Sequence, residues 1–184
     1  MRTLFVVVLL TSVLTACGTV TPPGTPSGTP SGSPPAPAPG SAAQGSSKAP
    51  EKLRFTAKTL DDQEFSGASM AGKAGVLWFW APWCPRCQGE APHLGALAKQ
   101  NAGKITFVGV GAQDQLPAMK KFVAENEVSG FQHLADLDAA VWTRFGITQQ
   151  PAYAFIYPNG SIEIVKQQLT EQGLNEKVSQ LTAG

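Results

Sequence analysis

The chain has no excess of charge of either sign. Among its 184 residues, 14 are Lys or Arg and 13 are Asp or Glu, so its formal net charge is +1. Domains that bind nucleic acid present clustered basic side chains, and no basic stripe runs through this sequence. The charge pattern therefore predicts no nucleic-acid partner.

The chain also lacks an apolar run long enough to span a bilayer, which takes about 20 residues. The run from Leu4 to Leu10 is shorter, follows Arg2, and precedes Leu-Thr-Ala and then Cys17. This arrangement predicts a secretory signal peptide over residues 1–16. Because a cleavage site that ends on cysteine resembles the bacterial lipobox, we expect Cys17 to be lipidated and to hold the protein on the outer face of the cell membrane. The alternative is an ordinary signal peptide in which Cys17 is incidental.

Cysteine is scarce as well, with 3 in the whole chain. Once Cys17 is assigned to lipidation, Cys84 and Cys87 remain as the one pair. A structural disulfide usually closes a longer loop, because a very short loop restricts the unfolded chain least. The short spacing therefore indicates a redox-active disulfide.

Large side chains are nearly absent between Gly18 and Pro50, where Pro, Gly, Ser, Thr and Ala dominate and Lys48 carries the single charge. Such a segment cannot bury enough apolar surface to fold. Residues 17–50 are therefore predicted to form the lipidated start and a disordered tether, with an O-glycosylated stalk as the alternative. Residues 51–184 are predicted to form one domain, large enough to bury a core without disulfide staples.

Within this domain, apolar runs alternate with stretches of helical spacing, which is typical of an α/β fold with a central sheet. A short hairpin is expected at its start, and the pair Asn159 and Gly160 predicts a second one. The predicted strands cover residues 53–59, 63–66, 76–80, 105–110, 152–157 and 161–166, and the predicted helices cover residues 84–99, 116–126, 139–145 and 171–181.

The cysteine pair lies where one of these strands is followed by a helix. A nucleophilic Cys84 must be a thiolate, so its surroundings have to lower its pKa below the ordinary value of about 8.5. Pro85 suits the first position of the helix, and the N–H groups of Arg86 and Cys87 would then point toward the sulfur. The helix dipole would favour the thiolate by about 0.3 to 1 kcal/mol, and by at most about 2 kcal/mol.

The Arg86 cation is a further source of thiolate stabilisation, since it is permanently charged and lies two residues from Cys84. An interaction that favours the thiolate favours the reduced enzyme and makes the disulfide a better oxidant. The alternative for Arg86 is a solvated side chain whose charge is screened by salt.

Cys87 is expected one helical turn further in and is predicted to be the resolving cysteine, which closes the intramolecular disulfide. Glu90 follows on the same face of the helix. A partly buried carboxylate there would have a raised pKa and could carry the proton for Cys87. The alternative for Glu90 is a solvated surface position.

Two segments resemble the thioredoxin superfamily. Residues 79–87 (FWAPWCPRC) are similar to its active-site segment, and residues 145–151 (FGITQQP) are similar to the segment that carries its cis-proline. The resemblance implies a thioredoxin fold, a central mixed β-sheet flanked by helices, here with an N-terminal β-hairpin extension. It also implies that Pro151 is cis and faces the disulfide, while the backbone of Gln150 pairs with a substrate strand. The alternative is a trans-proline that opens an edge strand.

Residues 87–92 further resemble the exported TlpA, ResA and DsbE branch, in which a glutamate lies three residues beyond the second cysteine. Cytosolic thioredoxins have a buried aspartate where this chain has Trp78, so the acid/base role moves to Glu90. The branch implies an enzyme, a thiol-disulfide oxidoreductase, whose redox group is the disulfide between Cys84 and Cys87 and which needs no cofactor.

Other aromatic and imidazole side chains are candidates for the same site. Trp83 and Pro85 are expected on its rim, where they can contact an unfolded substrate chain, and Trp80 is expected in the core or on that rim. His93 and His133 could be proposed as metal ligands, as in exported copper chaperones of related fold, but their spacing from the cysteines does not support this. We expect core or surface histidines and no metal site.

Together these features predict an extracytoplasmic oxidant that introduces disulfides into reduced or unfolded exported proteins. A membrane thiol oxidase would reoxidise it, and it would act as a monomer. Two alternatives stay open: a thiol reductant in cytochrome c maturation, which has the same fold, and a non-catalytic copper-binding or scaffold lipoprotein.

Overall fold

The computed structural model describes residues 49–183. The predicted signal peptide, Cys17 and nearly all of the predicted tether lie outside these residues. Ala49 is buried, and its carbonyl oxygen accepts a hydrogen bond of 2.8 Å from Nε of Arg54, so the packed domain includes the last residues before position 51. Between residues 49 and 183, no helix has the length and apolar character needed to cross a membrane.

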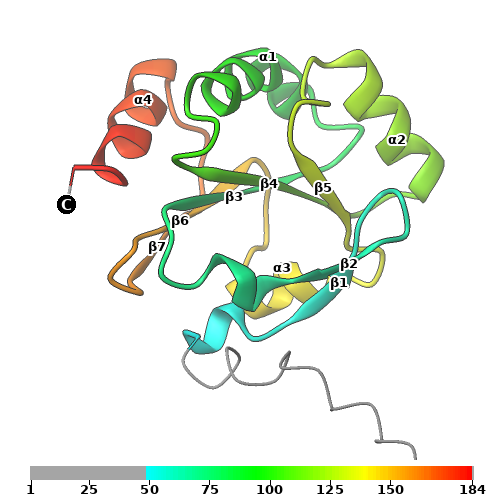
Figure 1. Ribbon diagram of the computed structural model, residues 1–184. Coiled ribbons are helices and arrows are strands. Elements are labelled where there is room, and N and C mark those ends of the chain that lie inside the picture. Colours follow the sequence, from blue (N-terminus) through cyan, green and yellow to red (C-terminus); the bar gives the residue numbers. More distant parts are fainter. Residues whose placement is uncertain (1–48, 184) are drawn as a thin grey trace, which may run out of the picture. The chain divides into compact units, whose positions relative to one another are not determined.

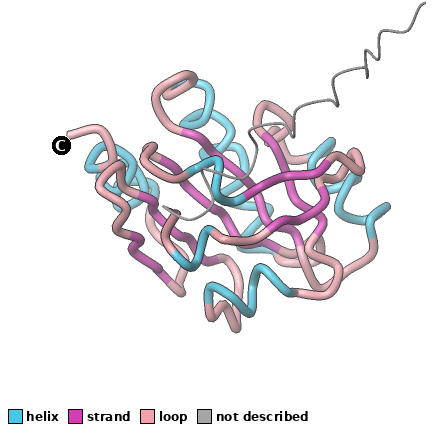
Figure 2. Tube along the Cα trace, turned by 60° about the horizontal axis from the view of Figure 1, so that its bottom comes forward, coloured by secondary structure: helices cyan, strands magenta, loops and turns pink. Residues whose placement is uncertain are grey.

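A five-stranded sheet in the order β5-β4-β3-β6-β7 forms the centre of the domain (Figure 1). The strands β3, β4 and β5 are parallel, whereas β6 is antiparallel to β3 and β7 is antiparallel to β6. Figure 2 shows the same strands in magenta from a view turned by 60°. The strands are β3 (Gly75–Trp80), β4 (Thr106–Gly111), β5 (Gln132–Ala135), β6 (Ala152–Ile156) and β7 (Ile162–Val165), and the separate hairpin consists of β1 (Thr56–Lys58) and β2 (Glu64–Ser66).

Helices cover both faces of this sheet. Three of them, α1, α2 and α4, lie on one face, and α3 lies on the other together with the hairpin (Figure 1). The mixed sheet flanked by helices, with its N-terminal hairpin, confirms the predicted fold class. The helices are α1 (Pro85–Gln100), α2 (Leu116–Glu125), α3 (Ala140–Phe145) and α4 (Glu171–Gln180), with short 3-10 turns η1 (Glu51–Leu53) and η2 (Gly67–Met70).

Strand β3 explains why the sheet needs both layers. All six of its residues are buried, as expected for a central strand that is covered on both faces. Because side chains alternate along a strand, Trp78 and Trp80 face the core beneath α1, α2 and α4, whereas Leu77 and Phe79 face the core on the α3 side. The strand thus points Trp78 at α1, the helix that carries the cysteines.

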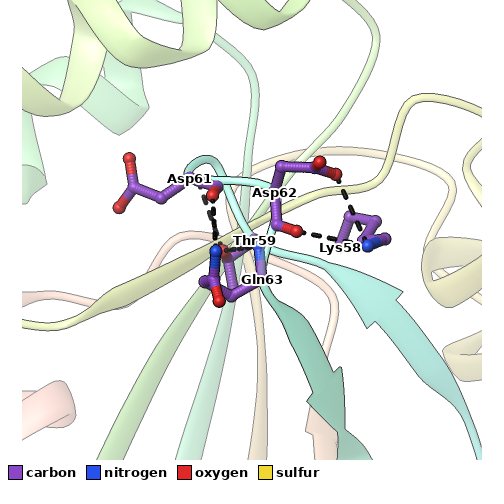
Figure 3. A network of polar contacts seen from close by, with 5 residues as sticks. All are labelled: Lys58, Thr59, Asp61, Asp62 and Gln63. Carbon is purple, nitrogen blue, oxygen red and sulfur yellow. Dashed lines mark hydrogen bonds and ion pairs between the residues drawn. The ribbon is translucent and has the colours of Figure 1, made fainter. Parts of the chain in front are cut away.

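The hairpin is joined to the sheet at its turn. Oγ1 of Thr59 accepts hydrogen bonds from the backbone N–H groups of Asp61 at 3.3 Å and Gln63 at 3.1 Å, which closes the turn (Figure 3). The N–H of Leu60 donates to the carbonyl oxygen of His133 at 3.0 Å. The turn therefore attaches to edge strand β5.

A buried aspartate attaches α3 to the end of β5. Oδ1 of Asp136 accepts from the N–H of Val141 at 3.0 Å, and Oδ2 accepts from the N–H of Trp142 at 2.9 Å. These N–H groups belong to the first turn of α3 and have no helical partner. Asp136 thereby satisfies two backbone donors that would otherwise be buried and unpaired.

Every predicted strand and helix is present, with bounds that differ by a few residues at the ends. Strand β5, which holds Gln132 and His133, was not expected from the sequence because it is short and contains polar residues. Pro92 lies inside α1, and the helix nonetheless runs to Gln100.

Candidate active site

A disulfide between Cys84 and Cys87 lies at the start of α1, directly beyond the end of β3. Cys84 is the N-cap of the helix, and Pro85 occupies its first turn, where a missing N–H leaves no bond unmade. The N–H of Cys87 donates to Sγ of Cys84 at 3.1 Å. Of the two N–H groups expected to point at the sulfur, that of Cys87 is the one bonded to it.

Both sulfur-bearing residues are buried, Cys84 with 3% and Cys87 with 0% of its surface exposed. Cys87 lies one helical turn after Cys84 and is closed to solvent. Cys87 belongs to the same buried core cluster as Ala91 and Tyr153. The outer sulfur, that of Cys84, is the one closer to the surface.

Glu90 is a buried carboxylate on the inner side of α1, with 9% of its surface exposed. Nε1 of Trp78 donates to its Oε1 at 2.6 Å, and the hydroxyl of Tyr153 donates to its Oε2 at 2.6 Å. Burial raises the pKa of Glu90, and it outweighs the hydrogen bonds from Tyr153, Trp78 and Gln168, which lower that pKa. A carboxyl group with a raised pKa can hold and release a proton closer to neutral pH.

The bond between Gln150 and Pro151 is cis, as the resemblance implied. Ala152, the next residue, pairs with Phe79 of β3. Because β3 and β6 are antiparallel, this register places Pro151 level with Trp80, at the end of β3 that leads into the cysteines. Pro151 is buried, and Gln150 is partly exposed.

Trp83 is an exposed aromatic side chain beside the disulfide, with 54% of its surface exposed. Its Nε1 donates to the carbonyl oxygen of Gln113 at 3.1 Å, which fixes the indole against the loop that follows β4. Trp83, Pro82 and Phe122 help to line a groove of about 260 Å³ next to this loop. Trp80, by contrast, is fully buried and belongs to the core.

Arg86 and Pro85 are exposed at the outer surface of the first turn of α1. Between residues 49 and 183, the guanidinium of Arg86 has no hydrogen bond or ion pair. The backbone carbonyl oxygen of Arg86 accepts a hydrogen bond from Nε2 of Gln168 at 3.4 Å. The charge of the guanidinium therefore lies in solvent, where salt screens it.

The family follows from a comparison of the whole chain with known proteins. The model of the AhpC/TSA family matches residues 46–165, which include the cysteines, Glu90 and the cis-proline. This chain belongs to the AhpC/TSA family. The soluble secreted antigen MPT53 of Mycobacterium tuberculosis is 39% identical to this AhpC/TSA member over 138 residues, which are 73% of this chain and 79% of MPT53.

Two solved structures support the same assignment. Mycobacterium tuberculosis (MTB) dsbF, in its mixed oxidized and reduced forms, is 50% identical with a TM-score of 0.72, and the match covers 73% of this chain and 100% of dsbF. A secreted disulfide oxidoreductase of the same organism, homologous to E. coli DsbE, is 39% identical with a TM-score of 0.68, covering 72% of this chain and 100% of that structure. The chain therefore has a thioredoxin fold and is a thiol-disulfide oxidoreductase of the DsbE type.

Sequence reasoning missed all three partners of Glu90, namely Trp78, Tyr153 and Gln168. Tyr153 pairs with Trp78 in the register of β3 and β6, so both residues point to the same face of the sheet. The cis-proline could have indicated Tyr153. A buried strand that begins directly after Pro151 pairs with the strand that leads to the cysteines, and Tyr153 is its second residue. Gln168 lies in the connection before α4, where the sequence carries no comparable pattern.

The two histidines lie apart from the disulfide and serve the packing. Nε2 of the buried His133 is 2.9 Å from the carbonyl oxygen of Val128, and burial lowers the pKa of His133 to about 4. His93 bonds to Asn175 of α4 at 3.1 Å. Within residues 49–183, no three His, Cys, Asp or Glu side chains form a group that could hold a metal ion.

Proposed function

We propose that this AhpC/TSA member is an exported oxidant that introduces disulfides into other exported proteins. The observation that carries the proposal is the position of Cys84 as N-cap of a helix of 16 residues, with the N–H of Cys87 donating to its sulfur. After reduction, the helix N-terminus and that N–H favour the thiolate of Cys84. A stabilised reduced form makes the disulfide a stronger oxidant.

The reaction begins when a substrate thiolate attacks Sγ of Cys84. A bond forms between the substrate sulfur and Cys84, the bond to Cys87 breaks, and Cys87 leaves as a thiolate that takes the proton of Glu90. A second substrate thiolate then attacks the substrate sulfur of this mixed disulfide, and Cys84 leaves as a thiolate. The substrate has lost two electrons to the enzyme, whose cysteines are now reduced.

The surface around Cys84 supports a role in binding an extended substrate chain. Trp83 and Pro85 are exposed beside the nucleophile and offer apolar contacts, while Gln150 and the cis-proline Pro151 offer a backbone segment for pairing. An unfolded chain has free backbone groups that can form such a pair. We therefore assign the substrate as a reduced or unfolded protein.

Export and anchoring are proposed on two grounds. MPT53 and the solved disulfide oxidoreductase homologous to E. coli DsbE are described as secreted, and residues 1–17 have the form of a lipoprotein signal. In this proposal Cys17 carries the lipid, the folded domain acts as a monomer outside the membrane, and a membrane thiol oxidase reoxidises it. Labelling of cells with a tritiated fatty acid tests the anchor, since the label should be absent from a Cys17→Ala variant.

One observation favours the opposite direction of electron flow. Arg86 is exposed and unpaired among residues 49–183, so it adds less to thiolate stability than a buried cation would. A weaker stabilisation corresponds to a lower reduction potential, which suits a thiol reductant, such as one that reduces the cysteines of apocytochrome c.

The reduction potential in glutathione buffers decides between the two directions. We expect a value on the order of 150 mV above that of thioredoxin, which is about −270 mV, together with oxidative refolding of a reduced, denatured protein. A potential near that of thioredoxin would instead support the reductant. The Cys84→Ser variant is the control and should refold no substrate.

A further inference from the structure

Besides the amide of Gln168, Glu90 accepts hydrogen bonds from two donors of different chemical kinds, Trp78 and Tyr153. The indole of Trp78 has an N–H and no acceptor, so it can only donate to Oε1. The hydroxyl of Tyr153 can donate or accept, and it faces Oε2. The two carboxylate oxygens are therefore not equivalent.

This difference decides where a proton can reside. With Glu90 ionised, both neighbours donate and both oxygens accept. With Glu90 neutral, a proton on Oε1 would weaken the bond from Trp78, which has no alternative partner on that side. A proton on Oε2 leaves the bond from Trp78 to Oε1 intact. The Tyr153 hydroxyl must then rotate its hydrogen away and accept a hydrogen bond from the protonated Oε2.

From this geometry we propose that Tyr153 is a positioning residue, which holds the proton of Glu90 on Oε2 and sets the pH range in which Glu90 exchanges that proton with Cys87. The inference rests on the proposed function, since it assigns to Tyr153 the control of the proton that the mechanism needs.

The hydroxyl of Tyr153 is suited to this role because it stays neutral. Burial and the neighbouring Glu90 raise the pKa of Tyr153 well above its ordinary value of 10.0. A hydrogen bond from the backbone of Leu169 lowers the pKa of Tyr153, and burial and Glu90 outweigh it. Tyr153 can therefore rotate its hydroxyl hydrogen without changing the net charge of the site.

Few other groups compete for the proton. Gln168, from the connection before α4, is neutral and bonds to Glu90. On α1 itself, Cys87 is the titratable neighbour once the disulfide is reduced. His93, further along α1, is turned toward α4, where it bonds to Asn175 and lies 4.0 Å from Glu171.

A Tyr153→Phe variant tests the proposal, and the chain supplies a matched control. Its only other tyrosine, Tyr157, also donates to a carboxylate, at 3.1 Å to Glu163, but away from the disulfide. The carbon-13 signal of the Glu90 carboxyl group, assigned with Glu90→Gln, is titrated in the oxidised full-length chain. We expect its pKa to rise by about one unit in Tyr153→Phe and to stay unchanged in Tyr157→Phe.

The second readout is the pH profile for formation of the mixed disulfide between reduced glutathione and Cys84, with release of Cys87. Its Glu90-dependent limb should move upward by the same amount in Tyr153→Phe. A Glu90 titration that is unchanged overturns the inference about Tyr153, and if the parent still oxidises reduced proteins, the proposed function stands. If the Glu90 titration shifts in Tyr153→Phe but the pH profile of mixed-disulfide formation does not, the proton role of Glu90 is overturned, and the role of Tyr153 with it.

A third arm works without removal of the hydroxyl, so it remains informative if Tyr153→Phe does not fold. Incorporation of 3-fluorotyrosine in the Tyr157→Phe background makes the Tyr153 hydroxyl a stronger donor. The titration of Glu90 should then move downward, opposite to the effect of Tyr153→Phe. Movement in the same direction, or none, would contradict the proposal.

Discussion

Replacing Arg86 with alanine tests how far an exposed cation adjusts the redox strength of the disulfide. The guanidinium is solvent-exposed and unpaired among residues 49–183. Interactions between exposed charges contribute about 0.2 to 1 kcal/mol. Since about 1.4 kcal/mol corresponds to about 30 mV for a two-electron couple, the expected change is at most about 20 mV.

The direction follows from the charge. Loss of the cation destabilises the Cys84 thiolate, which disfavours the reduced enzyme and makes the potential more negative. Arg86→Glu should double the shift, to at most about 40 mV, because it replaces attraction with repulsion. The assay is equilibration with glutathione buffers at low ionic strength and again at about 1 M salt, where the screening length is about 3 Å and the shift should vanish.

Two variants serve as controls. Arg86→Lys keeps the charge and should keep the potential, and Lys99→Ala removes an exposed cation from the last turn of the same helix. A shift well above about 60 mV in Arg86→Ala would refute a solvent-screened role for this side chain, since it would need an interaction beyond the range of exposed pairs. No shift at low salt would show that Arg86 does not stabilise the thiolate.

Three further predictions concern Glu90, Asp136 and Trp83. Burial raises the pKa of Glu90, so its contribution to stability is complete below the ordinary value of 4.5 and is lost as the pH rises through the raised pKa. Glu90→Gln should therefore gain in melting temperature relative to the parent as the pH increases from about 4.5. A difference in melting temperature that stays constant with pH would contradict this. Asp136→Ala should lower the free energy of unfolding by about 2 to 4 kcal/mol, seen in urea titration, whereas exposed Asp138→Ala, which loses a single bond of 3.2 Å, should cost less than about 1 kcal/mol. Trp83→Ala should raise KM for a reduced, denatured protein about tenfold and leave exchange with glutathione unchanged; equal loss with both thiols would place Trp83 in the chemistry and not in substrate binding.

The parts of the fold that were predictable from sequence have strong local signals. The apolar run of β3 marks a central strand, and Cys84 followed by Pro85 marks the start of a helix. The pair Asn159 and Gly160 marks the turn between β6 and β7. Strand β5 has no such signal, because its four residues mix polar and apolar side chains and, among residues 49–183, pair with β4 and the hairpin turn alone.

The candidate site divides in the same way. The disulfide and the position of Glu90 on the cysteine helix depend on spacing within one segment, so the sequence sufficed for them. The bond between Glu90 and Tyr153 joins residues 63 positions apart and depends on the register of β3 and β6. That register is a property of the assembled sheet, which periodicity along one segment does not encode.

The first two turns of α1 bear both sulfur atoms and the acid, while the strands beneath supply Trp78 and Tyr153. A tilt of this helix on the sheet would leave the spacing of its own three reactive groups intact but would stretch or shorten the bonds to the strands. Because the hydrogen bonds from Tyr153 and Trp78 lower the pKa of Glu90, the acidity of the site depends on how the helix packs on the sheet. It also means that a graft of residues 84–90 into another scaffold would keep the thiol chemistry and lose its tuning unless both strand side chains were moved with it.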